Sequence, residues 1–273
     1  MVEEYKYIFI VLVYKNIDVL DGFYESISNI DSHKVIILDS YYSDEVRAKC
    51  RAIAASHESV FLEIPNIGYG AGNNAGIKYA REHYKYDFLI VSNSDIIVKQ
   101  FDAVENFKGK ECIIAPETVM LTGKCQNPSQ INIPFLYNTY YYLTKWGYSK
   151  DIRFFITLSH ALTRSMKILF YLYCGLFRVR TAKIFAAHGS FFIMTAKAVE
   201  KLYPVFCDEM FLYNEETYLA FKSKTFGVPI YYCKDLMVNH LEGASCTGDH
   251  WKQWSYYKES ATIFVREKEK GFK

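Results

Sequence analysis

A segment rich in glycine and asparagine is the first part of the sequence whose residue types suggest chemistry. It reads Asn66-Ile-Gly68-Tyr-Gly70-Ala-Gly72-Asn73-Asn74-Ala-Gly76. Glycines at this density permit positive φ angles and a close approach of the backbone to a ligand. Residues 70–75 also fit the relaxed dinucleotide fingerprint, although that fingerprint belongs to the first strand–helix turn of its fold. A glycine-rich turn that begins a helix without binding any ligand remains the alternative.

Polar residues after an apolar run form the second candidate site, Ser92-Asn93-Ser94-Asp95. A carboxylate at the end of a buried strand can hold a hard divalent cation, which then bridges the phosphates of a nucleotide. The same residue types form Asx turns for structural reasons alone, so the segment does not decide between the two. His240 follows a later apolar run, and a lone histidine is by default structural.

An acidic segment near residue 215 is the third candidate site. Glu215 and Glu216 follow Asp208 and Glu209 closely in the sequence. Neighbouring carboxylates beside a cleft can supply a general base, because their surroundings tune the pKa. The alternative is a solvated start of a helix, where glutamates suit the positive end of the helix dipole. In isolation the segment favours that alternative.

The first hundred residues alternate between strand and helix periodicity. Apolar runs predict strands at 7–13, 34–38, 60–64 and 88–91, and helical spacing appears at 16–30, 44–56 and 74–83. This alternation predicts a parallel sheet with crossover helices. Parallel sheets bind ligands at the carboxyl ends of their strands. The polar residues directly after each strand, namely Asp39, Asn66 and Asp95, are therefore expected to lie at the ligand-binding edge.

The composition changes between residues 130 and 183. This stretch holds eight basic residues and one acidic residue, together with many aromatic residues. It predicts two or three amphipathic helices inserted between a first part (1–129) and a last part (184–273). Residues 168–177 form an almost unbroken apolar run, too short to span a bilayer but long enough to embed in one. Packing against the rest of the protein, with the basic groups facing water, is the alternative to contact with an anionic membrane.

Composition and charge exclude several classes of protein. A chain of 273 residues with a net charge of +2 is not a globally basic nucleic-acid binder. Its seven cysteines are scattered without any CxxC pair, which argues against a disulfide framework or a zinc ribbon and for reduced thiols. The acidic start with its short apolar run is a poor signal peptide. We therefore expect a cytoplasmic protein, peripheral on the inner face of the membrane if residues 130–183 bind lipid.

Read in chain order, these segments resemble glycosyltransferase family 2, in particular the rhamnosyl- and galactosyl-transferase-like enzymes of bacterial polysaccharide synthesis. The resemblance covers roughly residues 5–125 and 185–265. It rests on YIFIVLVYKN, VIILDSYYSD, residues 66–76, SNSD, HGSFFIMTAKAVEKL, DEMFLYNEETYLAFK and VNHLEGAS. Residues 66–76 are similar to the signature N-x-G-x-x-x-G-N-x-G, and SNSD stands in the place of the metal-binding D-x-D or N-x-D motif. Residues 113–127 look like the hairpin that follows that motif.

The resemblance implies an α/β protein with the GT-A nucleotide-diphospho-sugar transferase fold, a mainly parallel sheet flanked by helices, and a helical insert. It implies an inverting, metal-dependent transfer from a nucleoside-diphosphate sugar to a saccharide acceptor in surface polysaccharide synthesis, and a lipid-linked acceptor is expected. By the same resemblance, Asp95 and His240 would bind Mn²⁺ or Mg²⁺, and Glu216, or Glu215 as the alternate, would be the general base. The residues that would contact the donor are Asp39, Asn66, Gly68, Gly72, Asn73 and Asn93.

The sequence departs from the family pattern at several positions. Asn93 replaces the first Asp of D-x-D, Glu216 stands where the catalytic Asp usually falls, and residues 195–198 lack the usual Arg. Residues 130–183 match nothing in the general pattern. Two competing functions stay open from the sequence: a nicotinamide-dependent dehydrogenase, through residues 70–75, and a non-catalytic protein that binds a membrane surface or carbohydrate on a degenerate transferase fold.

Overall fold

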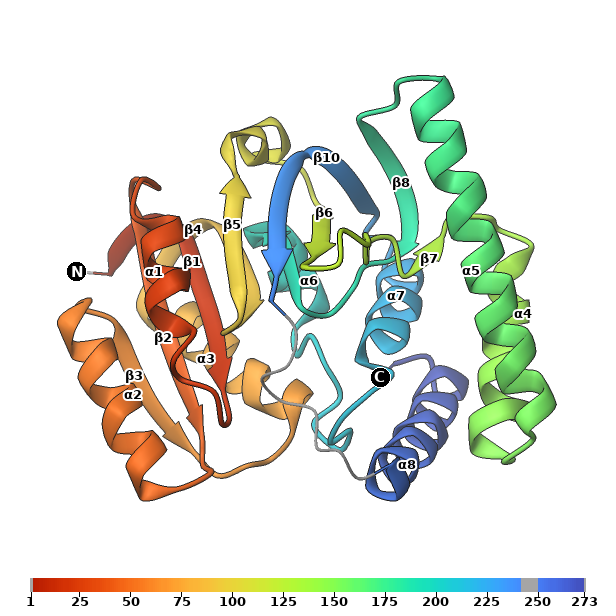
Figure 1. Cartoon of the computed structure of the whole chain (residues 1–273), viewed down its shortest axis with the longest axis horizontal. Coiled ribbons are helices and arrows are strands. Elements are labelled where there is room, and N and C mark those ends of the chain that lie inside the picture. The colour runs from red at the N-terminus through yellow and green to blue at the C-terminus, as the bar shows by residue number, and fades with distance from the viewer. Residues whose placement is uncertain (1, 242–249, 273) are drawn as a thin grey trace.

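The computed structural model describes residues 2–241 and 250–272. Its N-terminal half is a parallel α/β unit. Its strands are β1 (Glu3–Val13), β2 (His33–Ser40), β3 (Val60–Ile64) and β4 (Tyr84–Asn93), and its helices are α1 (Leu20–Ile27), α2 (Asp44–Ser56) and α3 (Tyr69–His83). The strands lie in the order β3-β2-β1-β4 and all pair in parallel. The predicted alternation is confirmed: the apolar runs form buried strands, and the segments between them form helices that connect one strand to the next (Figure 1).

The second half extends the same sheet with mixed pairing. Its strands are β5 (Ile96–Gln100), β6 (Ile113–Met120), β7 (Gln130–Ile131), β8 (Thr181–Ala186), β9 (Phe191–Thr195) and β10 (Ile230–His240). The sheet continues from β4 through β9, β6, β10 and β8 to β7, and β5 pairs with β10. β6 and β10 are parallel, whereas β9, β8, β7 and β5 run antiparallel to their neighbours. The expected parallel sheet is thus found in the first half, and the second half is mixed.

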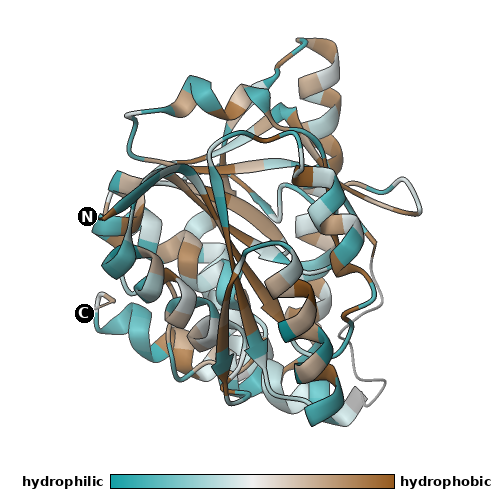
Figure 2. Ribbon diagram, turned by 90° about the vertical axis from the view of Figure 1, so that its left-hand side faces the viewer, coloured by the Kyte–Doolittle hydropathy of each residue, from teal (hydrophilic) through white to brown (hydrophobic). Residues whose placement is uncertain are grey.

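Helices cover both faces of the sheet, and two apolar clusters fill the space beneath them. One cluster joins the sheet to α3, to α6 (Ala196–Leu202), to α7 (Glu215–Thr225) and to α8 (His250–Glu269). The other joins it to α1, to α2 and to the short 3₁₀ helix η1 (Asp102–Phe107). Figure 2 shows the strands as hydrophobic ribbons through the middle of the molecule, with hydrophilic segments on the surrounding helices. Burial of this apolar surface is the main term that stabilises the fold.

The basic and aromatic stretch between β7 and β8 is helical, as predicted. It comprises α4 (Leu136–Thr144), the π-helical turn η2 (Lys145–Ser149) and the long helix α5 (Arg153–Leu176). The two ends of the predicted insert, 130–131 and 181–183, belong to β7 and β8 and so lie in the sheet. Helices α4 and α5 stand at the edge of the molecule opposite β3 (Figure 1). Among the described residues, none of the helices is both long enough and apolar enough to cross a bilayer.

The strand register brings the predicted polar residues to one edge of the sheet. In the parallel pairing of β1 with β2, Val13 is the partner of Asp39. In the pairing of β1 with β4, Leu12 is the partner of Asn93. Asp39 and Asn93 therefore flank the end of β1, about 10 Å apart given the spacing of neighbouring strands. This carboxyl edge is where a ligand is expected in a sheet of this kind.

Candidate functional site

Asp95 and His240 form a buried pair at the carboxyl edge of β4. Asp95 lies in the turn between β4 and β5, and His240 ends β10, which pairs with β5 so that His240 is opposite Ile96. Asp95 Oδ1 lies 3.2 Å from His240 Nε2, and the two residues are only 5% and 8% exposed. The backbone N–H of Leu241 donates to the carbonyl oxygen of Asp95 at 3.0 Å. The pairing of β5 with β10 thus brings together two residues that are far apart in the sequence.

The other ring nitrogen of His240 faces an amide. His240 Nδ1 lies 2.8 Å from Gln126 Oε1, a carbonyl oxygen that only accepts, so Nδ1 carries the proton. Nε2, on the other side of the ring, faces the carboxylate of Asp95. A carboxylate oxygen and an imidazole nitrogen 3.2 Å apart are joined by a cation or a proton that lies between them. The pair is therefore shaped to hold a positive charge.

A short turn, His188-Gly189-Ser190, connects the pair with other parts of the edge. The carbonyl oxygen of Ser190 accepts from the backbone N–H of Asn93 at 2.8 Å, and the His188 ring lies 6.0 Å from that of His240. Burial, and next the neighbouring His240, lower the pKa of His188 to about 3, so its ring is neutral at neutral pH. We refer to residues 188–190 as the central turn.

Glu216 reaches the same central turn from the start of α7. Its Oε1 accepts from the backbone N–H of Gly189 at 3.2 Å, and Tyr69 Oη donates to the carbonyl oxygen of Gly189 at 2.5 Å. Glu216 is partly exposed. Burial raises its pKa, and the hydrogen bonds from its own backbone N–H and that of Gly189 act in the opposite direction. A carboxylate with a raised pKa, held next to a ligand-binding edge, is suited to accept a proton.

Glu215 is placed differently from its neighbour. It is 5% exposed, and its Oε1 has no hydrogen-bond partner. Burial, and next the charge of Glu216, raise its pKa to about 8. Glu215 is consequently protonated at neutral pH. Both glutamates line a small, mainly apolar cavity together with Tyr69 and Phe206.

The glycine-rich segment forms the first turns of α3, and its glycines allow close packing. Gly68 has φ +95°, and a Cβ there would lie 2.4 Å from the carbonyl oxygen of Phe211. The backbone N–H of Tyr69 donates to that same oxygen at 2.8 Å. A Cβ on Gly72 would lie 2.9 Å from Leu12 on the sheet. These contacts fix α3 against β1 and against the chain that leads to Glu215 and Glu216.

The asparagines of this segment have different surroundings. Asn66 is exposed, and its Oδ1 accepts from Ser40 at 3.3 Å beside the end of β2. Asn73 is fully buried, with Nδ2 bonded to the carbonyl oxygen of Tyr69 and Oδ1 without a partner. Asn74 bonds residues 205, 206 and 208 and so anchors the loop before α7. Asn66 is thus open to a ligand, whereas Asn73 and Gly72 lie in packed surroundings, and any contact of theirs with a donor remains a prediction.

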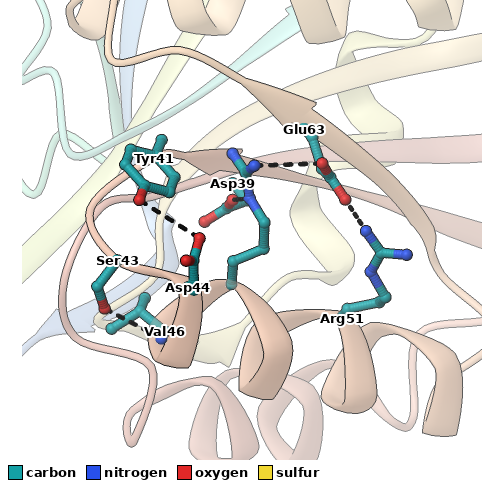
Figure 3. Close-up of polar contacts among 8 residues, drawn as sticks. Asp39, Tyr41, Ser43, Asp44, Val46, Arg51 and Glu63 are labelled. Carbon is teal, nitrogen blue, oxygen red and sulfur yellow. Dashed lines mark hydrogen bonds and ion pairs between the residues drawn. The ribbon is translucent and has the colours of Figure 1, made fainter.

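Asp39 lies at the centre of a charged network at the end of β2 (Figure 3). Its Oδ2 accepts from Arg47 Nε at 2.6 Å, and Arg47 also contacts Glu63, which in turn pairs with Arg51. Asp39 is fully buried, yet its Oδ1 has no partner. Since a buried polar atom without a partner costs free energy, this oxygen is available for a ligand that donates a hydrogen bond.

The structure brings together most of the residues predicted from the sequence, at one end of the sheet. Asn93 and Glu216 bond the central turn, His240 lies beside it, and Asp95 is joined to it through His240. Asp39 and Asn66 lie farther along the same edge, beyond β1. The sequence did not single out His188, Gln126 or Tyr69, which contact these residues. Only the small residues beside His188 hinted at the turn. Residues 242–245 of the predicted VNHLEGAS element lie outside the described residues.

Comparison with known proteins identifies the fold but no close relative. No protein-family model matches the sequence, and no curated protein matches it. Solved structures do match. One is GalNAc-T7 with UDP, GalNAc and Mn²⁺, with a TM-score of 0.60, 10% identity and coverage of 98% of this chain and 51% of that one. The chain has a GT-A glycosyltransferase fold.

Two further structures give the same result. The mannosyltransferase PcManGT from Pyrobaculum calidifontis, in complex with GDP-Man and Mn²⁺, matches with a TM-score of 0.54 and 12% identity, over 97% of this chain and 64% of that one. TarS 1-349 of S. aureus in complex with UDP matches with a TM-score of 0.53 and 12% identity, over 86% and 60%. The chain spans between about half and two thirds of the length of these three structures. At these identities the comparison establishes the fold alone.

The dinucleotide-binding alternative finds no structural support. Its candidate residues 70–75 lie inside α3, which follows the third strand, and Gly70 packs against Phe206. The turn between β1 and α1, where such a fingerprint belongs, contains no glycine.

Proposed function

We propose that this protein is an inverting glycosyltransferase, of the kind found in family 2, that moves a sugar from a nucleoside-diphosphate sugar to a hydroxyl group of a saccharide. The observation that carries the proposal is the convergence of Asp95, His240 and Glu216 on the central turn at the carboxyl edge of a GT-A sheet. A cation-binding pair and a carboxylate base are the two groups that such a transfer requires. Solved structures of similar fold contain UDP or GDP-mannose, two of them with Mn²⁺.

Asp95 and His240 would hold the divalent cation. A carboxylate oxygen and an imidazole nitrogen suit Mn²⁺, and the carboxylate alone suits Mg²⁺. The described residues bring no third His, Cys, Asp or Glu to the pair. When bound, the cation would offset the negative charge that develops on the departing diphosphate. Gln126 fixes the ring of His240 for this task, because it accepts the Nδ1 proton.

Glu216 would act as the general base. It is partly exposed and held by Gly189, whereas Glu215 is buried and retains its proton up to a pH of about 8. A base must be ionised and within reach of the hydroxyl proton. Glu216 would take that proton as the acceptor oxygen attacks the anomeric carbon from the face opposite the diphosphate, and the configuration of that carbon would invert.

The donor nucleotide would occupy the edge between β2 and β4. Asp39 Oδ1 is free to accept an N–H of the base or a ribose hydroxyl. Asn66 lies next to Ser40 at the end of the same strand, and Asn93 is positioned beside the cation-binding pair. We further propose a lipid-linked saccharide in surface polysaccharide synthesis as the acceptor, with the protein in the cytoplasm or at the inner face of the membrane.

The test is incubation with a panel of nucleotide sugars with and without Mn²⁺ or Mg²⁺. We expect release of nucleoside diphosphate that depends on the cation, and NMR of the glycoside should show inverted anomeric configuration. A change in nicotinamide absorbance without sugar transfer would indicate the dehydrogenase instead. Donor or saccharide binding without turnover, across a full acceptor panel, would indicate the non-catalytic alternative.

A further inference from the structure

The long helix α5 is apolar on two opposite sides. Its inner side buries Phe170 and Cys174 against the rest of the protein. Large apolar side chains also lie on the opposite side, where solvent reaches them, two near the start of the helix and four near its end: Phe154, Leu158, Ile168, Leu169, Leu172 and Leu176. We call these six residues the outer stripe. Leu172 is 63% and Leu176 is 78% exposed, which is unusual for neighbouring large aliphatic residues on one helix.

The charged side chains of α5 itself are all positive, and Asp151, which precedes the helix, is paired with Lys258. Arg153 and Arg164 lie along one edge of the stripe, and Arg178 follows the end of the helix, all of them exposed. No Asp or Glu occurs anywhere between residues 152 and 199. An apolar stripe on a helix whose own charges are all cationic complements a surface that offers both hydrocarbon and negative charge, which is the surface of an anionic bilayer.

Aromatic residues stand near both ends of α5. At one end Tyr142 stacks on Trp146, with ring centroids 5.0 Å apart, and both rings are partly in solvent. At the other end Tyr173 and Phe177 lie 5.1 Å apart and are likewise exposed. Tyr and Trp gather at membrane–water interfaces, because they combine an apolar body with a polar tip. Their placement fits a helix that lies along the bilayer surface.

A second copy of the chain suits the outer stripe less well. In a symmetric dimer the same patch meets itself. The arginines of one copy (Arg153, Arg164 and Arg178) would then face the same set of arginines on the other copy, with no carboxylate of α5 between them. Like charges at an interface are unfavourable. A bilayer with anionic headgroups has no such conflict.

We propose that α5 is a membrane-docking helix that lies in the interface of an anionic bilayer with its outer stripe embedded. The inner side of the same helix reaches the candidate site. Lys167 Nζ donates to the carbonyl oxygen of Gln126, and Tyr171 Oη donates to that of Asn127. Docking would therefore hold the His240 side of the site close to the bilayer. That this serves a lipid-linked acceptor rests on the proposed function, but the docking itself does not.

Vesicle co-sedimentation of the whole chain tests the proposal without any measurement of activity. The vesicles are phosphatidylcholine alone, or phosphatidylcholine with 30% phosphatidylglycerol as a chosen probe composition, at low and high salt. We expect binding to anionic vesicles that weakens at high salt, because the screening length falls from ~10 Å at 0.1 M to ~3 Å at 1 M. Arg164→Glu/Arg178→Glu should lower the partition coefficient about 30-fold or more, since the loss of each basic residue near the surface weakens binding about fivefold.

Two matched controls separate the outer stripe from general surface properties. Leu172→Asn/Leu176→Asn should lose binding, whereas Val2→Asn/Leu121→Asn changes two exposed aliphatic residues outside α5 and should bind as the parent does. Lys85→Glu/Lys99→Glu reverses two exposed charges on β4 and β5 and should have much less effect than the arginine pair. Equal partitioning to both kinds of vesicle, none to either, or full binding by the arginine variant would overturn the proposal. A lipid-free dimer that Leu172→Asn/Leu176→Asn dissociates, with no vesicle binding by the parent, would assign the stripe to a second copy.

Discussion

The buried carboxyl of Glu215 should make the stability of this protein fall as the pH rises. Its pKa is about 8 in the folded protein because of burial and the charge of Glu216, whereas an unfolded glutamate titrates near 4.3. Between these values the unfolded chain releases a proton that the folded chain keeps. Fewer protons are then bound in the unfolded state, so the free energy of unfolding decreases with increasing pH. The effect is absent below the unfolded pKa and reaches its limit above pH 8.

Glu215→Gln removes this effect while it keeps the size of the side chain and its neutrality at low pH. From pH 5.5 to 7.5 the parent should lose about 2.5 kcal/mol of stability relative to the variant, since each pH unit counts for about 1.4 kcal/mol until the folded pKa is approached. For 273 residues the unfolding entropy is about 0.6 kcal/mol/K. The difference in Tm between variant and parent should therefore grow by about 4 °C over this pH range.

Thermal melts of parent and variant at pH 5.5 and 7.5 measure this double difference, in which the other titrating groups cancel. Glu200→Gln makes the same chemical change at an exposed position of α6 and supplies the baseline. A Tm difference for Glu215→Gln that changes with pH no more than this baseline does would refute the reasoning. It would mean that Glu215 is ionised in the folded protein, and Glu215 would then return as a candidate base.

The remaining predictions concern the site and α3. Asp95→Ala should keep the fold but abolish both sugar transfer and the Mn²⁺-dependent thermal stabilisation by nucleoside diphosphate. His240→Ala should reduce both less severely. Normal turnover of Asp95→Ala with metal present would contradict the assignment. Glu216→Gln should retain donor binding by calorimetry but lower turnover by roughly 10²–10⁴-fold, and a larger loss for Glu215→Gln would exchange the two roles. Gly68→Ala should lower the free energy of unfolding, measured by urea denaturation, by about 2 kcal/mol or more, because strain at its positive φ adds to the clash with Phe211. Gly109→Ala is the control, since Gly109 has a positive φ but open space around it and so measures the strain alone. Equal losses for the two variants would show that the clash at Gly68 relaxes.

Local periodicity predicts the first half of the fold closely. The strand at 60–64 and the helix at 44–56 have the same limits in the structure as in the sequence pattern. Strands buried on both faces are continuous apolar runs, so they stand out without any knowledge of their partners. The helix α3 begins at Tyr69 instead of Asn74. The reason is that its glycines serve close packing against Leu12 and Phe211, and these contacts join residues far apart in the chain.

The second half and the site depend on such long-range contacts to a greater degree. The antiparallel strands β5, β7 and β8 are short or have mixed patterns, and their pairing with β10 or with each other is invisible in the sequence. The resemblance to family 2 pointed to Asp95, His240 and Glu216, and the structure brings them to one turn. It did not point to His188 or Gln126, because nothing in the sequence around them distinguishes a side chain that positions another residue.

The contacts of α5 with residues 126 and 127 have a thermodynamic consequence. Lys167 and Tyr171 hold these residues, and Gln126 in turn holds His240. A bilayer that displaced α5 would change the setting of His240 and, with it, the affinity for the donor by some factor. Reciprocity then requires the donor to change the affinity for the bilayer by the same factor. Vesicles would then be an allosteric effector of donor binding as well as a docking surface. The factor by which vesicles change donor affinity and the factor by which the donor changes vesicle affinity, measured independently, must agree.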